Sequence, residues 1–382
     1  MDNIYSIQDE TLTAIGEAIR QKGNTTELLT PLEMPQAIID IPLGVVPPVG
    51  ALHFTGNTKG LFANGKWDWF IEQLGDQITT ENLLSIEEMF KLSTLKKISF
   101  AINRTNNDSN AGNNSCAYCF QQCYDLEELP DITGKLSNCY MFLSQCRSIR
   151  EIPESWANIG WSYTNKQTSM SYCRLSSFFD RCFSLRKIPE SVVKQMYNKC
   201  ASNGCDGMFY YCTCLDEIVG LRGPDTSTGS NVFSSMFTNC FRLKRLVFDM
   251  DNGQPRVYDW SYQTLDLTNR VGYTETTYNR DNYILPYNSG ITADKEVVDD
   301  ATYQALKDDP DWFTWKIEYS RYNHDSAVET INSLPDCSQR GTTNNIKFKG
   351  ASGSKTDGGA INTLTAEEIA VATAKGWTVS FS

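Results

Sequence analysis

The order of apolar and polar residues repeats through the middle of this chain. An aromatic residue or leucine, a cysteine and two aliphatic residues follow one another at intervals of three, with polar residues between them. The first copy runs from Phe120 through Cys123 and Leu126 to Leu129, and four more copies follow after 23 to 36 residues each. Such a phrase is typical of stacked repeats, because one copy cannot bury its apolar side alone. The pattern therefore predicts an α/β repeat solenoid.

The recurring cysteines are expected to form a ladder inside this stack. Free cysteine packs like a small apolar side chain and suits a tight interior position. The aromatic residue and the cysteine are three apart, as on one turn of a helix, so both are expected to point inward. The expected repeat-core ladder consists of Cys123, Cys146, Cys182, Cys212 and Cys240.

Short strands are expected after each ladder cysteine. The two aliphatic residues that end each copy predict the strand, and Pro130, Pro153 and Pro189 are expected to end three of them. A degenerate earlier copy without the cysteine surrounds Phe90, and residues 331–335 look like a partial later copy.

The phrase resembles the BspA-like leucine-rich repeat family, whose copies carry a similar Met-Phe-x-x-Cys-x-x-Leu-x-x-Leu core. Met208-Phe209 and Met236-Phe237 match that core best, and the resemblance covers residues 85–248. It implies an irregular leucine-rich-repeat array with short strands. Because the family is defined by its architecture, the resemblance implies no particular activity.

A helical attachment module is expected in residues 1–42. Residues 9–22 carry one apolar stripe, and a second short helix begins at Thr30-Pro31 with a capping pattern. Two such helices bury too little surface to be stable alone, so they are expected to pack on another protein. The candidate attachment face consists of Leu12, Ile15, Ile19, Met34, Ile38 and Ile41.

This N-terminal segment also resembles one that opens many structural proteins of phages and prophages of gut bacteria. Residues 12–38 carry the resemblance, and residues 67–80 and 364–379 are similar to parts of phage repeat proteins. The resemblance implies that residues 1–42 attach the protein to a virion.

Other segments are expected to close or interrupt the stack. Residues 43–84 predict a linker and the N-terminal cap that a solenoid requires. Residues 249–325 are rich in Tyr, Asp, Asn and Thr, which predicts an elaborated insertion rather than a disordered loop. Residues 326–382 are expected to hold the last partial repeat and a C-terminal cap.

The expected C-terminal cap contains two strands and a helix. Ile346 and Phe348 alternate as in a strand. A helix is expected to begin with a capping box at Thr365 and to end at Gly376, and residues 377–381 alternate as a last strand.

Composition narrows the class of protein. The 382 residues include 34 basic and 46 acidic ones, for a net charge of −12, and no basic run occurs, which argues against a nucleic-acid partner. The start of the chain lacks the features of a secretory signal, and no stretch approaches the ~20 apolar residues of a membrane span. We therefore expect no membrane insertion, and we expect the 13 cysteines to be reduced thiols.

Candidate catalytic and metal-binding patterns are weak. Cys116, Cys119 and Cys123 are spaced as in some zinc sites, but Cys123 belongs to the ladder and no fourth ligand is evident. Only two histidines exist, His53 and His324, and neither lies in a recognised catalytic motif. Carboxylate pairs at 127–128 and 216–217 are expected to be solvated on the strands. We expect no enzymatic activity, metal or cofactor.

Aromatic residues in the irregular segments are better candidates for recognition. Tyr and Trp offer rigid amphipathic contact area to sugars or protein surfaces, and ligands are often bound by loops. The alternative is that many of them cover the core, as we expect for Tyr210. The candidate receptor contacts are Trp161, Tyr163, Tyr258, Trp260 and Tyr262.

The repeats and the resemblances together predict a structural protein of a phage virion, associated with the tail or a fibre, that binds a bacterial surface protein or glycan. It is expected to assemble in the host cytoplasm as a homo-oligomer, and several copies would raise a weak affinity. Two alternatives stay open: a capsid-attached fibre or decoration protein, and a bacterial surface adhesin of the BspA-like family. A hydrolase is a third, since the fold alone can bring a carboxylate pair together.

Overall fold

The computed structural model describes the middle and the C-terminal end of the chain in separate stretches. The described residues are 52–105, 115–161, 175–196, 205–222, 233–240, 242–249, 263–268, 322–338, 344–348 and 364–381. The expected attachment module in residues 1–42 lies outside them, as do Tyr163, Tyr258, Trp260 and Tyr262.

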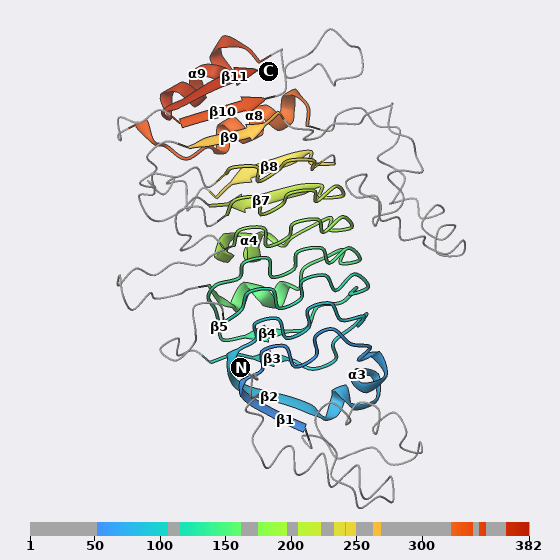
Figure 1. Cartoon of the computed structure of the whole chain (residues 1–382). Helices are drawn as coiled ribbons and strands as arrows, with labels where there is room; N and C mark the ends of the chain where they lie inside the picture. The colour runs from blue at the N-terminus through green and yellow to red at the C-terminus, as the bar shows by residue number, and fades with distance from the viewer. Residues whose placement is uncertain are drawn as a thin grey trace, which may run out of the picture.

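The described residues form a mixed α/β fold in which short parallel strands lie one above another (Figure 1). Four pairs, β1–β2, β3–β4, β5–β6 and β7–β8, form two-stranded sheets, and β9, β10 and β11 form a three-stranded sheet with β10 in the centre. The strands are β1 (Leu52–Asn57), β2 (Ile78–Ser85), β3 (Ile102–Asn103), β4 (Ile132–Thr133), β5 (Lys135–Leu136), β6 (Gly160–Trp161), β7 (Glu217–Leu221), β8 (Arg245–Phe248), β9 (Thr264–Leu267), β10 (Asn344–Phe348) and β11 (Trp377–Phe381).

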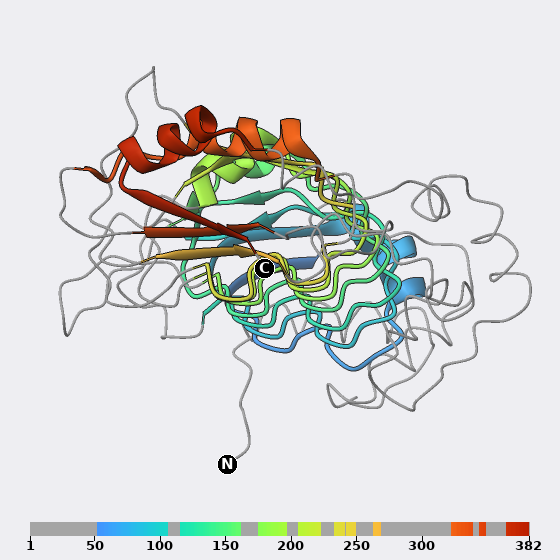
Figure 2. The ribbon, with the colours of Figure 1, turned by 90° about the horizontal axis from the view of Figure 1, so that it is seen from above.

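Most of the short helices lie along one flank of the strands. In Figure 2 the green α4, the orange α8 and the red α9 follow this flank, whereas the blue α3 lies away from it, at the right of the view. The helices are α3 (Asp68–Leu74), α4 (Glu190–Met196), α8 (His324–Ser333) and α9 (Ala366–Ala374), with 3₁₀ turns η1 (Gly75–Gln77) and η3 (Glu154–Asn158).

Each copy of the repeated phrase occupies one layer of the stack. We number the layers 1 to 6 by the residue that precedes the ladder position by three: Phe90, Phe120, Leu143, Phe179, Phe209 and Phe237. In layers 1 to 6 this residue is buried, and so are the two aliphatic anchors, apart from the half-buried Leu129. The apolar positions of the phrase therefore form one interior that runs through the stack.

The segment between the aromatic residue and the cysteine is not helical, so our expectation of a helical turn was wrong. In layer 2, Tyr118 and Gln122 have φ angles of 60° and 62°, in the left-handed region. Their N–H groups point to the next layer, where Tyr118 N donates to Tyr140 O over 3.0 Å and Gln122 N donates to Ser144 O over 2.9 Å. A helix would keep these N–H groups for itself, whereas consecutive tight turns release every second one to bind the neighbouring layer.

The ladder cysteines lie in the interior and repeat one hydrogen bond. Each thiol donates to a backbone carbonyl oxygen of the preceding layer, over distances of 2.8 to 3.1 Å. The acceptor is the residue that lies three positions before the ladder position of that layer. The pairs are Cys123–Phe90, Cys146–Phe120, Cys182–Leu143, Cys212–Phe179 and Cys240–Phe209. The cysteine therefore supplies both packing volume and a bond that links consecutive layers.

Aromatic rings stack along the same interior. The rings of Phe90 and Phe120 lie 5.2 Å apart and nearly parallel, as do those of Phe179 and Phe209 at 5.5 Å. Where layer 3 has Leu143, the neighbouring Phe142 continues the contact, at 5.3 Å from Phe120. A substitution at one position is thus compensated by the residue beside it.

Strand formation depends on the proline that follows some copies. Before Pro130, Pro153 and Pro189 the structure has only single bridges, Lys97 to Glu128 and Glu151 to Lys187. Layers 5 and 6 have no proline there and form the longer strands β7 and β8. Proline cannot donate to a strand partner, so three of the expected strands are reduced to bridges.

The C-terminal cap has the expected elements at 344–348, 366–374 and 377–381, and α9 begins with a capping box between Thr365 and Glu368. The partial copy expected at 331–335 was wrong, because Ile331 lies in helix α8 and not before a strand. That helix also crosses the boundary expected between residues 325 and 326, and the insertion expected at 249–325 contributes strand β9.

Candidate binding groove

The outer side of the layers carries a pair of charged residues between the two aliphatic anchors. The anchors point inward, so the residues between them face solvent or the rim of the stack. From layer 1 to layer 6 the pairs are Lys96-Lys97, Glu127-Glu128, Arg150-Glu151, Arg186-Lys187, Asp216-Glu217 and Lys244-Arg245. The sign of the charge thus changes repeatedly along the stack.

At least one side chain of each pair lines a groove of about 1540 Å³ that crosses all six layers. Its wall extends from Lys96 in layer 1 to Arg245 in layer 6 and includes Pro153 and Pro189 with the residues after them. Among the described residues, seven acidic and four basic side chains line it, together with Leu129, Ile152 and other aliphatic groups, and no described aromatic residue does. We refer to this surface as the groove.

Several groove charges neutralise one another between layers. Lys97 and Glu128 form an ion pair at 2.9 Å, and Glu217 lies 3.7 Å from Lys187 and 3.4 Å from Arg245. The carboxylates at 127–128 and 216–217 were expected to be solvated, but Glu128 and Glu217 form ion pairs with neighbouring layers. Such exposed pairs contribute little stability, but like charges facing each other would oppose the register, so the alternation favours this stacking order.

The centre of the groove keeps unneutralised negative charge. Glu127 and Glu151 in layers 2 and 3 are exposed and have no ion-pair partner among the described residues. Lys96, at the end of the groove, is likewise unpaired within the described part. These side chains are available to a partner molecule without first breaking an internal ion pair.

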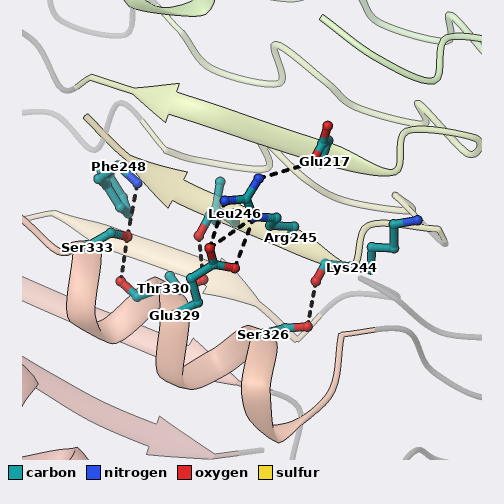
Figure 3. A network of polar contacts seen from close by, with 9 residues as sticks. All are labelled: Glu217, Lys244, Arg245, Leu246, Phe248, Ser326, Glu329, Thr330 and Ser333. Atoms are coloured by element: carbon teal, nitrogen blue, oxygen red, sulfur yellow. Dashed lines mark hydrogen bonds and ion pairs between the residues drawn. The ribbon is translucent and has the colours of Figure 1, made fainter. Parts of the chain in front are cut away.

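Helix α8 packs against β8 in layer 6 (Figure 3). Ser326 and Thr330 donate their hydroxyls to the carbonyl oxygens of Lys244 and Leu246, at 2.5 and 2.6 Å. Ser333 accepts the N–H of Phe248 at 3.0 Å. The three hydroxyls lie on one face of the helix and bind the β8 edge, where another layer would otherwise pair.

An ion-pair relay accompanies this contact at the rim. Arg245 lies between Glu329 of α8, at 2.9 Å, and Glu217 of β7, at 3.4 Å. The hydrogen bonds to Glu329, and then the charge of Glu329 and the contact with Glu217, raise the pKa of Arg245 above its usual value. The arginine therefore remains charged and joins the helix to two layers.

Trp161 is not a surface contact, so its selection as a receptor-contact residue was wrong. Its side chain is 4% exposed, and its ring packs edge-on against Phe178 at 5.9 Å. Tyr210, expected in the core, is instead half-buried beneath the guanidinium of Arg181 at 5.6 Å. Both outcomes depend on a neighbouring layer, which the local sequence does not reveal.

From the sequence alone, the groove carboxylates were expected only to be solvated residues of the strands. The signal that marks them is the charged dipeptide between the aliphatic anchors of every layer, whose shared outward direction becomes visible only when the layers are stacked. The other four candidate aromatic residues lie outside the described residues.

No group of three or more His, Cys, Asp or Glu side chains within the described residues is arranged to hold a metal ion. Among the helices that the structure describes, none has the length and apolarity that crossing a membrane requires.

In comparisons with known proteins, no family model, no curated protein and no solved structure matches this chain.

Proposed function

We propose that this chain is a leucine-rich-repeat solenoid of a phage virion and that it binds a bacterial surface protein through the groove. The solenoid assignment is supported by the one phrase repeated in six layers and by the layer-to-layer hydrogen bonds of the ladder cysteines. The virion assignment rests on the sequence resemblance of residues 12–38, which lie outside the described residues.

The observation that carries the binding proposal is the groove with its unneutralised acidic centre. Stacked repeats commonly present such extended surfaces to partners. The described lining residues combine charged and aliphatic groups and include none of the aromatic rings that suit sugars, which favours a protein partner over a glycan. Because acidic side chains outnumber basic ones there, the contacting segment of the partner is expected to be basic.

Cell binding tests this proposal directly. The purified full chain, fluorescently labelled, is incubated with a panel of gut bacterial strains, and bound fluorescence is measured over a range of salt concentrations. The variant Glu127→Lys/Glu151→Lys reverses two unpaired groove charges and is expected to weaken binding about ten-fold or more.

A matched control keeps the same change in net charge away from the groove. Glu72→Lys/Glu367→Lys alters two exposed carboxylates, on α3 and α9. It is expected to bind cells as the original chain does. Equal loss in both variants would show that net charge rather than the groove governs binding, and unchanged binding in both would rule the groove out.

Deletion of residues 1–42 tests the virion assignment separately. The shortened protein is expected to bind cells through the groove but to be absent from purified phage particles. If it still joins particles, residues 1–42 are not the attachment module. Detection of the full chain on bacteria that carry no phage would instead favour the adhesin alternative.

A further inference from the structure

A buried polar cluster lies between layers 2 and 3, away from the groove charges. Arg104 is 4% exposed, and its guanidinium donates to the carbonyl oxygens of Lys135, Leu84 and Ser115 at 2.9 to 3.1 Å. No carboxylate of the described residues pairs with it. A buried cation surrounded by neutral oxygens favours a negative charge nearby.

Cys116 is the thiol placed to carry that charge. Its Sγ lies 3.7 Å from the hydroxyl of Ser115, which is itself 3.5 Å from the Arg104 guanidinium, and 3.9 Å from the hydroxyl of Ser137. The thiol of Cys139 in the next layer also forms a hydrogen bond with it. All these side chains are buried, so the cluster is enclosed.

The electrostatics of Cys116 differ from those of the ladder thiols. Burial alone would raise its pKa, but hydrogen bonds from Cys139, Ser137 and Ser115 and the charge of Arg104 outweigh burial and lower the pKa to about 6. Among the ladder cysteines, burial raises the pKa of Cys146, Cys182, Cys212 and Cys240. Cys116 is therefore converted to thiolate more readily than these four ladder thiols.

We propose that Cys116 and Cys139 form a peroxide-sensitive pair that closes to a disulfide between layers 2 and 3. The Cys116 thiolate attacks one oxygen of hydrogen peroxide, the O–O bond breaks, and sulfenic acid and hydroxide form. The Cys139 thiol then attacks the sulfenic sulfur, and the disulfide forms with release of water. Both sulfurs are oxidised, the peroxide is reduced, and a dithiol reverses the process.

The geometry permits this bond. The two layers are joined by backbone hydrogen bonds near this site, as when Tyr118 N donates to Tyr140 O at 3.0 Å, and chain segments paired in this way lie ~4.8 Å apart. A disulfide requires roughly 4.4–6.8 Å between its Cα atoms. The Sγ of Cys116 already reaches the next layer, where it lies 3.9 Å from the hydroxyl of Ser137, two residues before Cys139. Hydrogen peroxide is small and neutral, which suits a site that bulky disulfide reagents do not reach. The bond would join the two layers that carry Glu127 and Glu151 and so fix their spacing in the groove.

Peptide mapping of the folded full chain tests the pair. After peroxide treatment and blocking of the remaining thiols, trypsin cuts after Arg104, Lys135 and Arg147, which separates the peptide of Cys116 from that of Cys139. A disulfide between these peptides is expected, and fragmentation locates it. Cys116→Ala and Cys139→Ala are expected to abolish it, whereas Cys123→Ala and Cys146→Ala retain it. In Cys139→Ala, dimedone is expected to label Cys116 as sulfenic acid.

The pH dependence of the oxidation rate reports the pKa of Cys116 even if peroxide reaches the buried thiol slowly, because slow access lowers the rate equally at every pH. Between pH 6 and pH 8 the thiolate fraction rises about 2-fold for a pKa of about 6 but ~90-fold for the ordinary value of 9.0. The oxidation rate of Cys116 is expected to follow the shallow profile. Arg104→Met, checked for folding by circular dichroism, is expected to steepen this pH profile. If that variant does not fold, Ser115→Ala replaces it in the same measurement, with the same expected result.

Three results would overturn the proposal. The first is a Cys116 thiol that stays reduced in the folded protein at millimolar peroxide. The second is a rate that rises ~90-fold between pH 6 and pH 8. The third is oxidation of the ladder cysteines at the rate of Cys116. None of these results depends on whether the groove binds a bacterial partner.

Discussion

Replacing Ser93 by cysteine is expected to extend the ladder by one layer and to stabilise the fold. Ser93 follows Phe90 by three residues, as Cys123 follows Phe120, so it occupies the ladder position of layer 1. Its hydroxyl is buried and has no hydrogen-bond partner among the described residues. Phe62 stacks on Phe90 at 5.3 Å as the layers above stack on each other, so its carbonyl oxygen is the expected acceptor for a thiol at position 93.

The size of the effect follows from the unsatisfied hydroxyl. Burying a polar group without a partner costs ~1–3 kcal/mol, and a thiol is a weaker polar group that packs as a small apolar side chain. Allowing for some crowding by the larger sulfur, we expect Ser93→Cys to raise the free energy of unfolding by ~1–2 kcal/mol.

Urea unfolding followed by circular dichroism measures this change. With a slope of ~3 kcal/mol per molar urea, the midpoint is expected to rise by roughly 0.5 M. Ser93→Ala removes the hydroxyl without adding a donor, so it is expected to lie between the original chain and Ser93→Cys. A cysteine variant no more stable than the alanine variant would refute the ladder bond as a source of stability.

Three further predictions concern single positions. Thr330→Val leaves a buried carbonyl oxygen of β8 without its donor and is expected to lower the free energy of unfolding by ~1–3 kcal/mol, measured by urea titration. Hydrogen bonds to Asp325 and Glu368 raise the pKa of His324 above 6.5, and an NMR titration should show the pKa fall in Glu368→Gln. The protonated His324 therefore stabilises the folded state at pH values below its ordinary pKa of 6.5, and this stabilisation is lost as the pH rises through the raised pKa. Gly134→Ala should destabilise by ~1–3 kcal/mol in thermal melts, since φ is +84° and the new Cβ would lie 2.1 Å from the carbonyl oxygen of Arg104.

The spacing of the phrase predicted which residues share the interior. Aliphatic anchors and cysteines at fixed intervals are a strong signal, since each position is buried by the same position of its neighbours. The C-terminal helix was predictable for a different reason: Thr365 and Glu368 form a local capping box that needs no distant partner.

The backbone between the aromatic residue and the cysteine was not predictable. Positive φ angles usually favour glycine or asparagine, yet Met141, Gln145 and Arg181 adopt them here. Hydrogen bonds to the next layer offset the strain, as when Arg181 N donates to Tyr210 O at 2.8 Å. Such bonds exist only after stacking, so no window of local sequence carries the signal.

The groove was hidden for a related reason. Glu127 and Glu151 are ordinary exposed carboxylates in the linear sequence, and only their shared direction across layers 2 and 3 makes them one surface. Trp161 shows the opposite error, since a residue expected at the surface is buried. It lies beside a long insertion, but Phe178 of the adjoining layer packs against its ring. Whether a side chain is exposed in a stack depends on the residues of the neighbouring layer. The repeated phrase gives the residues of its own layer only, so it does not predict exposure.

A stack held by layer-to-layer backbone bonds has no inherent end, so the sequence must specify one. Layer 6 presents the β8 edge, which could accept a further layer or a second molecule. Ser326, Thr330 and Ser333 bind that edge with side-chain hydroxyls, and their helix has no strand edge to offer in return. Strands β8 and β9 accordingly belong to separate sheets, and β9 pairs with β10 instead. The number of layers in the stack is therefore set by the helix that binds the β8 edge in place of a next layer, as well as by the number of repeats.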